Sequence, residues 1–493
     1  MRTALPAVYF QTHGCAKNEV DTRHMAQRLT DEGFSVVDSP QDANILVVNT
    51  CGFLEAATRE SLEAVLELAE DKGDKLLIMV GCVPARYHKE LKGSLPADLP
   101  EVDAFIDVVS EKNIASILRD LWEEKLQQKQ QQQPHLKQQN QQNQQQQSHL
   151  EQQQQQQQNQ QVQRHQSDTN ETKTATPSHA TPLPASTSTA LQGWAYVKIS
   201  DGCNRFCSFC TIPFIRGRYQ SRSYADIEQE VRALLEEGVQ EIDFVGQDTG
   251  VYGQDISDKN EPQSLAQLVW KLAPLFKEHS AKMRLLYVQP DGMDEELIEA
   301  YADCDELLKY IDIPVQHTSA RLLKAMKRKG SAAEFRELFK TLRTRVPDLI
   351  LRTTLMVGFP GETEEDVVEL LSFVEEVGFD YVSSFSYSQE EPARAAYLPQ
   401  QIQEEVKLER LQRLLDCVQA TGEKKAAEHV GDTARVLVCG EEDGETVGRA
   451  WFQAPDSDGV VIIEGATIAP GTSVSVSIHE SCGFDLIGSI VDD

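Results

Sequence analysis

Short apolar runs alternate with amphipathic helical patterns over most of the chain. Near the N-terminus, strands are expected at residues 8–11, 45–49 and 76–80, and helices at residues 19–32 and 55–71 between them. An alternation of strands and helices predicts a parallel sheet with helices on its faces. We therefore expect residues 1–125 to form a doubly wound α/β domain.

The same alternation resumes after residue 191 and continues to about residue 425. Six strand patterns are expected, at residues 195–199, 241–245, 283–288, 310–314, 349–357 and 380–385. Helical patterns separate them, at residues 224–237, 264–276, 295–301, 332–345 and 364–377. Six βα units of this size predict a partial (β/α) barrel over residues 192–428.

The end of the chain has a different pattern, in which short β runs and turn residues replace the helices. Strands are expected at residues 434–438, 447–451, 460–463 and 473–478. We expect residues 429–493 to form a small all-β barrel. The whole chain is then of the α/β class, with three folded domains.

Residues 126–191 interrupt this organisation. Between residues 127 and 166, 25 of 40 residues are glutamine, and a stretch rich in Ser, Thr, Pro and Ala follows. Such a sequence buries too little apolar surface to offset the chain entropy that is lost on folding. We expect a disordered insert that serves as a linker, with self-association as the alternative because glutamine-rich tracts are prone to aggregate.

Charge narrows the possible partners. The 493 residues include 78 acidic and 47 basic side chains, which gives a formal net charge of −31. Proteins that hold nucleic acid chiefly through its phosphates need clustered Lys and Arg, so this balance disfavours that class. Residues 430–493 carry 12 acidic side chains against two arginines, which suits a basic protein partner. An acidic surface that serves only solubility is the alternative.

The sequence lacks the patterns typical of membrane spans and signal peptides. It has no run of about 18 uncharged apolar residues, and its first residues lack the apolar core of a signal peptide. We expect a cytoplasmic protein without a membrane partner. In a reducing compartment, its ten cysteines are expected to be ligands, nucleophiles or buried apolar residues rather than disulfides.

Three cysteines form a local motif, with Cys203, Cys207 and Cys210 in the spacing C-x3-C-x2-C directly after the expected strand at residues 195–199. Three thiolates in one loop can bind one iron–sulfur cluster, and they are one fewer than the four that complete a four-iron cluster. The remaining iron is then open to a small molecule. The motif also follows a barrel strand, where barrel enzymes place their chemistry. A zinc knuckle or unrelated thiols are the alternatives.

A second set, Cys15, Cys51 and Cys82, has no local spacing, yet each cysteine comes just after a strand of the first domain. Parallel neighbouring strands end at one edge, where open α/β sheets bind ligands. Adjacent glycines permit tight turns around a bulky group. We infer a second cluster site, with three unrelated buried cysteines as the alternative. Plain structural roles are favoured for the remaining Cys304, Cys417, Cys439 and Cys482.

The motif at residues 203–210 resembles that of the radical S-adenosylmethionine superfamily. Two three-cysteine sites followed by a terminal barrel similar to a TRAM domain resemble the methylthiotransferases of that superfamily. Within this family, several segments are similar to the ribosomal-protein branch (RimO) rather than to the transfer-RNA branch (MiaB). They are GCAKNEVD (14–21), VNTCGF (48–53), GQDT (246–249), YIDIPVQH (310–317) and LLKAMKRK (322–329).

The resemblance implies a transferase that uses S-adenosyl-L-methionine and two 4Fe-4S clusters. One catalytic cluster would be held by Cys203, Cys207 and Cys210 and would cleave S-adenosylmethionine reductively. The other, on the N-terminal cysteines, would supply sulfur for a methylthio group. The implied substrate is the β-carbon of an aspartate on the twelfth small-subunit ribosomal protein, free or on the ribosome. An electron donor such as flavodoxin or ferredoxin is implied as well, with the sulfur donor unknown.

The resemblance also implies contacts to S-adenosylmethionine. The segment LMVGFPGETE (355–364) is similar to one that lines the adenosine in the superfamily, so Gly358, Gly361 and Glu362 are candidates. A plain βα loop is the alternative there. Five polar residues at strand ends or within strands are further candidates, although hydrogen bonding inside the barrel fits them equally. They are Gln247, Asp248, Gln316, His317 and Arg352.

Two other functions are consistent with these observations. The nearer one is a methylthiotransferase of the MiaB type that acts on adenosine in transfer RNA by the same chemistry. The other is a non-catalytic iron–sulfur carrier, which would form no 5′-deoxyadenosine from S-adenosylmethionine.

Overall fold

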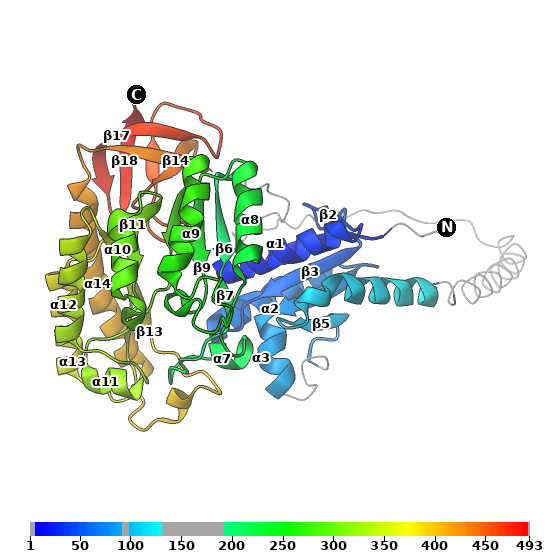
Figure 1. The fold of residues 1–493 in the computed structure, drawn as a ribbon. Helices are drawn as coiled ribbons and strands as arrows, with labels where there is room; N and C mark the ends of the chain where they lie inside the picture. The colour runs from blue at the N-terminus through cyan, green and yellow to red at the C-terminus, as the bar shows by residue number, and fades with distance from the viewer. Residues whose placement is uncertain (1–4, 91–97, 130, 132–191, 492–493) are drawn as a thin grey trace, which may run out of the picture.

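The computed structural model describes residues 5–90, 98–129, 131 and 192–491. These residues form a five-stranded sheet, a six-stranded sheet, a closed β-barrel and one two-stranded sheet. In Figure 1 the N-terminal sheet lies beside the six-stranded sheet, and the barrel lies across one end of the latter. The expected α/β class is confirmed.

The N-terminal sheet has five parallel strands in the order β2-β1-β3-β4-β5. They are β1 (Ala7–Thr12), β2 (Ser35–Val37), β3 (Ile45–Thr50), β4 (Leu76–Gly81) and β5 (Ala104–Asp107). Three of them lie where the apolar runs predict strands. The other two, β2 and β5, have only three and four residues, which is too short for a recognisable pattern.

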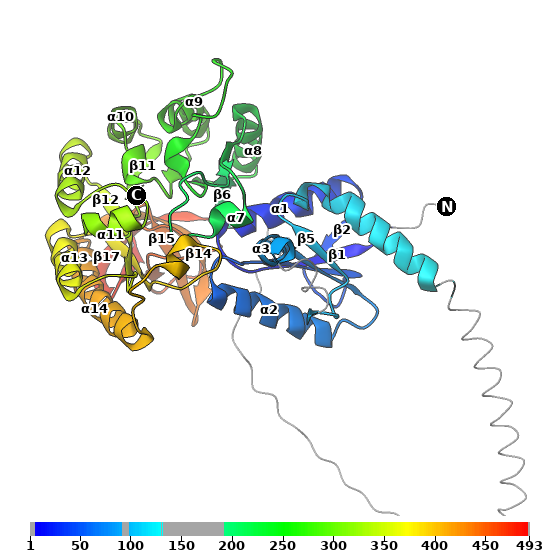
Figure 2. The same ribbon diagram turned by 90° about the horizontal axis from the view of Figure 1, so that it is seen from below.

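Helices cover both faces of this sheet (Figure 2). They are α1 (Ala16–Asp31), α2 (Glu55–Glu70), α3 (Cys82–Glu90) and a helix at residues 114–129 that follows η1 (Glu111–Asn113). Val8 and Phe10 of β1 pack in one core with α1 and the 114–129 helix. Tyr9, between them, packs in a second core with α2 and α3. Alternate residues of a strand face opposite sides, so the doubly wound arrangement follows from the apolar runs.

One expectation about the glutamine-rich tract is wrong. Gln127, Gln128 and Lys129 continue the helix at residues 114–129, whereas the disordered insert was expected to begin at residue 126. Glutamine and lysine are good helix formers, and no Gly or Pro ends the helix at this point. The rest of the tract, residue 130 and residues 132–191, lies outside the described residues.

The central domain is built on six parallel strands in the order β6-β9-β10-β11-β12-β13. All six were predicted, and they are β6 (Trp194–Lys198), β9 (Glu241–Val245), β10 (Lys282–Leu285), β11 (Leu307–Asp312), β12 (Ile350–Val357) and β13 (Tyr381–Ser386). The sheet is open, as a partial barrel requires. After β6, the strands β7 (Ser200–Asp201) and β8 (Gln220–Ser221) form a two-stranded antiparallel sheet. This pairing brings together the two ends of the loop between them.

Six longer helices form an arc outside this curved sheet (Figure 2). They are α8 (Tyr224–Glu236), α9 (Leu265–Glu278), α10 (Glu295–Asp303), α12 (Ala332–Arg345), α13 (Glu364–Val377) and α14 (Glu404–Glu428). Short turns and helices occupy the loops, namely α7 (Ile212–Ile215), η3 (Thr249–Val251), η4 (Pro290–Gly292), α11 (Ala320–Ala325) and η5 (Arg394–Tyr397). Thr363 caps α13 in a capping box with Asp366. Such caps place the strand-to-helix loops, which carry the polar residues of the site.

The terminal domain is a closed five-stranded barrel. Its strands are β14 (Thr433–Glu442), β15 (Glu445–Ala450), β16 (Val461–Ile463), β17 (Ser473–Cys482) and β18 (Asp485–Ile490). The sequence pattern predicts the first four. The fifth, β18, closes the barrel by pairing with both β16 and β17.

The terminal barrel packs against the starts of the central strands. Arg449 of β15 donates to Glu241, the first residue of β9, over 3.0 Å. Arg284 of β10 donates to the carbonyl oxygens of Trp451 and Gln453, each over 3.1 Å. The barrel therefore lies at the amino ends of the strands, opposite the loops that follow their carboxyl ends (Figure 1). Because Arg449 is buried in this interface, it does not offset the acidic surface of the barrel.

Candidate active site

The three N-terminal cysteines meet at the carboxyl edge of the first sheet. Cys15, Cys51 and Cys82 directly or closely follow β1, β3 and β4, which are neighbours in that sheet. A Cβ added to Gly14 would lie 2.8 Å from the Cβ of Cys51, and one added to Gly52 would lie 2.9 Å from the carbonyl oxygen of Cys82. The three cysteine loops are thus in contact, and glycine is what permits the close approach.

Burial differs among these three thiols. Cys51 and Cys82 are buried, whereas Cys15 is exposed at the rim. Burial raises the pKa of the Cys82 thiol to about 12, and the nearby Arg216 guanidinium partly opposes this rise. Burial also raises the pKa of Cys51. Both thiols must lose a proton to bind iron, so binding at this site releases protons.

The second group of cysteines lies in a single loop after β7. The backbone N–H of Cys210 donates to the carbonyl of Cys207 over 3.1 Å, and that of Cys203 donates to Gly217 over 3.2 Å. Gly202 has a φ of +73°, and a Cβ there would overlap the carbonyl oxygen of Arg218. Burial raises the pKa of the Cys210 thiol to about 12, and the neighbouring Cys207 adds to the rise. Backbone hydrogen bonds therefore fix the path of the loop that carries the three cysteines.

Both groups fit iron–sulfur clusters better than a single metal ion. Within the described ranges, no three His, Cys, Asp or Glu side chains converge closely enough to hold one ion. A mononuclear structural zinc needs four such ligands, so the zinc knuckle loses support. In a cluster each thiolate binds a different iron, so three cysteines at each site match a four-iron cluster with one open iron.

The two groups of cysteines lie in neighbouring segments of the molecule. Thr211, directly after Cys210, donates to the carbonyl oxygen of Phe53, two residues after Cys51, over 3.1 Å. Lys17, in the first turn of α1, lies 3.2 Å from the ring centre of Tyr287, which follows β10. The N-terminal cysteine loops therefore face the carboxyl edge of the central sheet.

Buried charges join the two domains beneath the N-terminal cysteines. Arg216 pairs with Asp21 over 2.9 Å and with Asp201 over 3.3 Å, and Lys198 pairs with the same two carboxylates. Burial would raise the pKa of Asp201, but Lys198 and Arg216 outweigh it and hold the pKa at about 2. Burial and the charge of Asp21 raise the pKa of the adjacent Glu111. Two cations and two carboxylates thus balance one another, with Arg216, Lys198 and Asp21 buried and Asp201 partly open to solvent at 38% exposure.

Several predicted cofactor contacts gather where strands of the central sheet end. Gln247 follows β9, Gln316 follows β11 and Glu362 follows β12. In Gln247 and Gln316 the side-chain oxygen (Oε1) is buried without a hydrogen-bond partner in the described structure. Glu362 Oε1 is also buried, and it faces the buried Nε2 of His317 at 3.3 Å. Buried polar atoms in native proteins almost always have partners, so these atoms fit a site for a polar ligand.

The other predicted contacts have different surroundings. Gly358 and Gly361 have φ angles of +76° and +82°, and Glu362 Oε2 accepts from the N–H of Gly358 over 2.8 Å. Asp248 accepts from Arg205 over 2.5 Å. Arg352 is not brought to the cysteine loop. It pairs with Asp312, bonds Ser383 and reaches Asp458 of the terminal barrel, which is a structural role at the domain interface.

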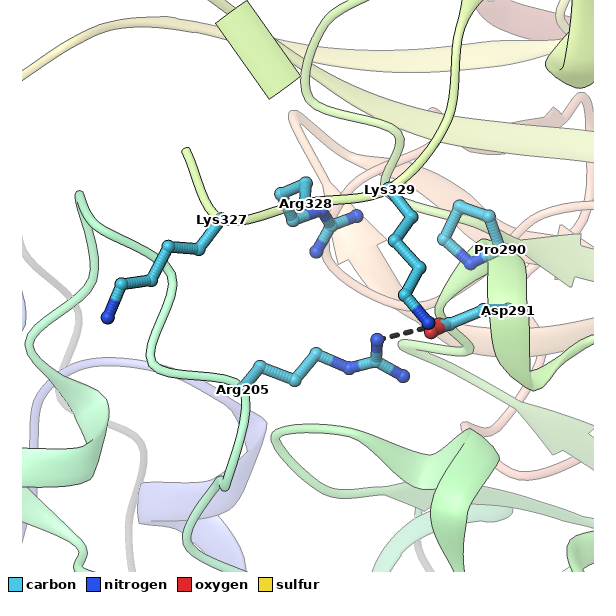
Figure 3. Close-up of a pocket in the computed structure, with 6 residues that line it drawn as sticks. All are labelled: Arg205, Pro290, Asp291, Lys327, Arg328 and Lys329. Atoms are coloured by element: carbon cyan, nitrogen blue, oxygen red, sulfur yellow. Dashed lines mark ion pairs between the residues drawn. The ribbon is translucent and has the colours of Figure 1, made fainter. Parts of the chain in front are cut away.

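Beside the cysteine loop is a pocket that the sequence did not predict. Arg205, from the loop itself, lies 2.6 Å from Asp291 of η4. Figure 3 shows Arg205 and Lys329 pointing toward Asp291, with Arg328 above them. The full lining is Arg205, Pro290, Asp291, Lys327, Arg328 and Lys329. Four basic side chains against one acid give this pocket a positive character in an otherwise acidic protein.

Three protein-family models match the chain. "Uncharacterized protein family UPF0004" matches residues 7–105, "Radical SAM superfamily" matches residues 197–374 and "TRAM domain" matches residues 430–491. A solved structure, the radical S-adenosylmethionine methyltransferase TsrM from Kitasatospora setae, has the same fold with a TM-score of 0.52. It is 14% identical, and the match covers 78% of this chain and 72% of that one.

Curated relatives match over the full length. The chain is 36% identical to ribosomal protein uS12 methylthiotransferase RimO of Geobacter sulfurreducens, with 100% of both chains covered. It is 34% identical to the protein of that name from Clostridioides difficile, with 98% of each covered. For the protein of that name from a Thermotoga species, the identity is 36%, with 97% and 98% covered.

The fold, the two cysteine sites and these matches define a radical S-adenosylmethionine methylthiotransferase, a transferase that uses S-adenosylmethionine and iron–sulfur clusters. More narrowly, the chain belongs to the RimO family of uS12 methylthiotransferases. This supports the ribosomal-protein branch over the transfer-RNA branch. In the part of the chain that is described, no helix is long and apolar enough to cross a membrane.

Proposed function

We propose that this protein adds a methylthio group to the β-carbon of an aspartate on ribosomal protein uS12. The full-length similarity to uS12 methylthiotransferases carries the proposal. Two three-cysteine sites in neighbouring loops support it, because the reaction needs both a radical and a source of sulfur.

The two cysteine groups take different roles in this proposal. Cys203, Cys207 and Cys210 would hold the catalytic cluster, and Cys15, Cys51 and Cys82 would hold the auxiliary cluster. When bound, the clusters supply the electron that cleaves S-adenosylmethionine and the sulfur that is transferred. With three thiolates at each site, one iron of each cluster stays open for a ligand.

The remaining site residues bind and orient the cofactor. The buried oxygens of Gln247 and Gln316 lack partners and would accept hydrogen bonds from S-adenosylmethionine, and Glu362, whose Oε1 faces His317, would lie beside them. Gly358 and Gly361 permit the positive φ angles of the turn after β12 that carries Glu362. Asp248 acts indirectly, since it fixes Arg205 beside Cys203. Arg352 has no part in this proposal.

Charge supports a basic protein as the substrate. The terminal barrel is acidic, and Arg449, one of its two arginines, is neutralised by Glu241 in a buried pair. The acidic surface of the barrel is therefore well suited to a ribosomal protein, either free or on the ribosome. The protein would then work in the cytoplasm, with an electron carrier such as flavodoxin or ferredoxin.

The proposal is tested with the full-length protein, reconstituted anaerobically and supplied with S-adenosylmethionine, sulfide and a reductant. Purified uS12 and bulk transfer RNA are offered in parallel and analysed by mass spectrometry. We expect a methylthio group on one aspartate of uS12 and none on adenosine. A methylthio group on transfer RNA alone would establish the other branch of the family. Absence of 5′-deoxyadenosine under all conditions would instead favour an iron–sulfur carrier.

A further inference from the structure

One arginine of the central domain reaches into the N-terminal cysteine site. Arg216 follows α7, six residues after Cys210, and its side chain is 2% exposed. Its Nη2 lies 3.6 Å from the sulfur of Cys82, within hydrogen-bond distance for a sulfur acceptor. The same nitrogen lies 3.5 Å from Oδ1 of Asn18, in the first turn of α1. The central domain therefore supplies a cationic donor to a cysteine of the other domain.

The orientation of this guanidinium is fixed from its other side. Nη1 of Arg216 donates to Asp21 over 2.9 Å and lies 3.3 Å from Asp201. Lys198 pairs with the same two carboxylates, so the group contains two positive and two negative charges. These ion pairs hold the guanidinium in place. A planar guanidinium can bond carboxylates at one nitrogen and a sulfur at another, which the single ammonium of a lysine cannot do in the same geometry.

Among the described residues, no arginine side chain donates to the sulfurs of the loop that carries Cys203, Cys207 and Cys210. Its arginine, Arg205, turns its guanidinium away to Asp248 and Asp291. The sulfurs of Cys203 and Cys210 are instead stabilised by the backbone N–H groups of Arg205 and Ile212. A buried cationic donor at the Cys82 sulfur therefore gives the two sets of thiolates different electrostatic surroundings. Hydrogen bonds to the sulfurs of an iron–sulfur cluster are among the factors that set its reduction potential.

We propose that Arg216 is a positioning residue for the auxiliary cluster, donating an N–H···S hydrogen bond to the Cys82 thiolate that raises the reduction potential of that cluster. The physical reason is that a cationic donor stabilises the more negative, reduced state of the cluster. The inference rests on the proposed function in one respect, namely that Cys15, Cys51 and Cys82 hold a cluster. A purely structural role, in which Arg216 only neutralises Asp21 and Asp201, would leave the potential unchanged.

The test uses the full chain with Cys203, Cys207 and Cys210 all replaced by alanine, so that only the auxiliary cluster is loaded. Its potential is measured by redox titration monitored by electron paramagnetic resonance. Arg216→Gln is compared with Arg218→Gln, which removes an exposed arginine that lies over Phe206 in the same segment. We expect Arg216→Gln to lower the ratio of reduced to oxidised cluster at a fixed potential at least tenfold. This corresponds to a midpoint potential lower by about 59 mV for one electron. Arg218→Gln should leave it unchanged.

A second measurement does not depend on the glutamine variant folding. Arginine labelled with ¹⁵N is incorporated into the same three-alanine parent and its Arg216→Lys variant, and nitrogen couplings to the reduced cluster are recorded by pulsed resonance. We expect a guanidinium nitrogen coupling in the parent and its loss in Arg216→Lys.

The outcomes separate the two proposals. If the parent itself binds no iron and sulfide, the auxiliary cluster site is wrong and the role of Arg216 falls with it. If the parent binds a cluster, the inference is overturned by an unchanged potential in Arg216→Gln, or by a coupling that persists in Arg216→Lys.

Discussion

The two cysteine sites of this protein are built in different ways. Cys203, Cys207 and Cys210 share one loop, where hydrogen bonds within and around the loop set their positions. Cys15, Cys51 and Cys82 are 36 and 31 residues apart and meet only because β1, β3 and β4 are neighbours in a parallel sheet. The first site depends on local sequence, and the second depends on the fold.

The second site also depends on the central domain. Arg216 reaches Cys82 from the central domain. Arg86 of α3 donates to the carbonyl of Gly52 over 2.9 Å and pairs with Glu390, from the loop after β13, over 2.9 Å. The N-terminal cysteine edge is thus held by groups from both domains, and disturbing their contact should affect this site more than the cysteine loop.

The largest effect is expected from removing a ligand of the catalytic loop. Cys207→Ala should abolish formation of 5′-deoxyadenosine and remove roughly half of the bound iron, because one of two clusters is lost. Product chromatography and iron analysis of anaerobic protein measure both. Cys417→Ala, at a half-buried cysteine outside both sites, serves as the control and should retain iron and product. Formation of 5′-deoxyadenosine by the Cys207 variant would refute the assignment of this loop.

The next largest effect concerns the contact between the domains. Glu390→Gln leaves Arg86 charged and buried without its partner, which costs about 3–5 kcal/mol. Denaturant unfolding of the metal-free protein should show this loss, and auxiliary iron should fall while the catalytic loop keeps its cluster. The control is Glu228→Gln, which breaks an exposed pair with Arg232 and should cost less than about 1 kcal/mol. Equal losses in both variants would contradict a special role for the buried pair.

Glycine substitutions separate close approach from backbone strain at each site. Gly14→Ala combines a positive φ with a contact of 2.8 Å to Cys51, whereas Gly73→Ala has a positive φ and open space. The strain alone is about 1–3 kcal/mol in each case. We therefore expect only Gly14→Ala to lose auxiliary iron, as measured by iron content per protein.

In the same way, Gly202→Ala should disturb the catalytic loop and Gly217→Ala, with nothing near it, should not. Equal iron losses for the two variants of either pair would contradict the explanation that close contact, rather than backbone strain, disturbs the site.

The smallest effect is a pH dependence that the two sites share. The pKa of the metal-free thiol is raised to about 12 at both Cys82 and Cys210, so both thiols are protonated at neutral pH. Loading a cluster releases these protons, and the affinity should therefore rise with pH at both sites. Cluster loading from pH 6.5 to 8.5 measures this, followed separately in the variant with Cys203, Cys207 and Cys210 replaced by alanine and in one with Cys15, Cys51 and Cys82 replaced by alanine. Loading that is independent of pH would contradict protonated metal-free thiols.

The sequence predicts the two sites unequally well, for the same physical reason that distinguishes them. The spacing of Cys203, Cys207 and Cys210 is visible without a fold. The meeting of Cys15, Cys51 and Cys82 follows once the apolar runs are interpreted as parallel strands. Arg216 and Glu390 carry no such signal, because their partners lie 134 and 304 residues away, at Cys82 and Arg86. Contacts over such separations are fixed by domain packing, which no local pattern encodes.

The errors in the fold and site have similar causes. β18 is missed because alternation in Asp485–Ile490 is weak, and its place is set by barrel closure. The helix that runs into Gln127 and Gln128 shows that composition alone does not end a helix. Arg352 lies on a central strand, as expected, but its charge is taken up by Asp312 and by Asp458 of the terminal barrel. The direction in which a strand residue faces, and its partners there, depend on the other domain.

The most direct test of the account is whether the two cysteine sites carry separate parts of one reaction. Cys82→Ala is assayed anaerobically with S-adenosylmethionine, reductant and uS12, and 5′-deoxyadenosine and methylthio-aspartate are measured in the same samples. We predict that this variant still forms 5′-deoxyadenosine but transfers no methylthio group to uS12. Methylthio-aspartate at the wild-type level in this variant would contradict the division of work between the two sites.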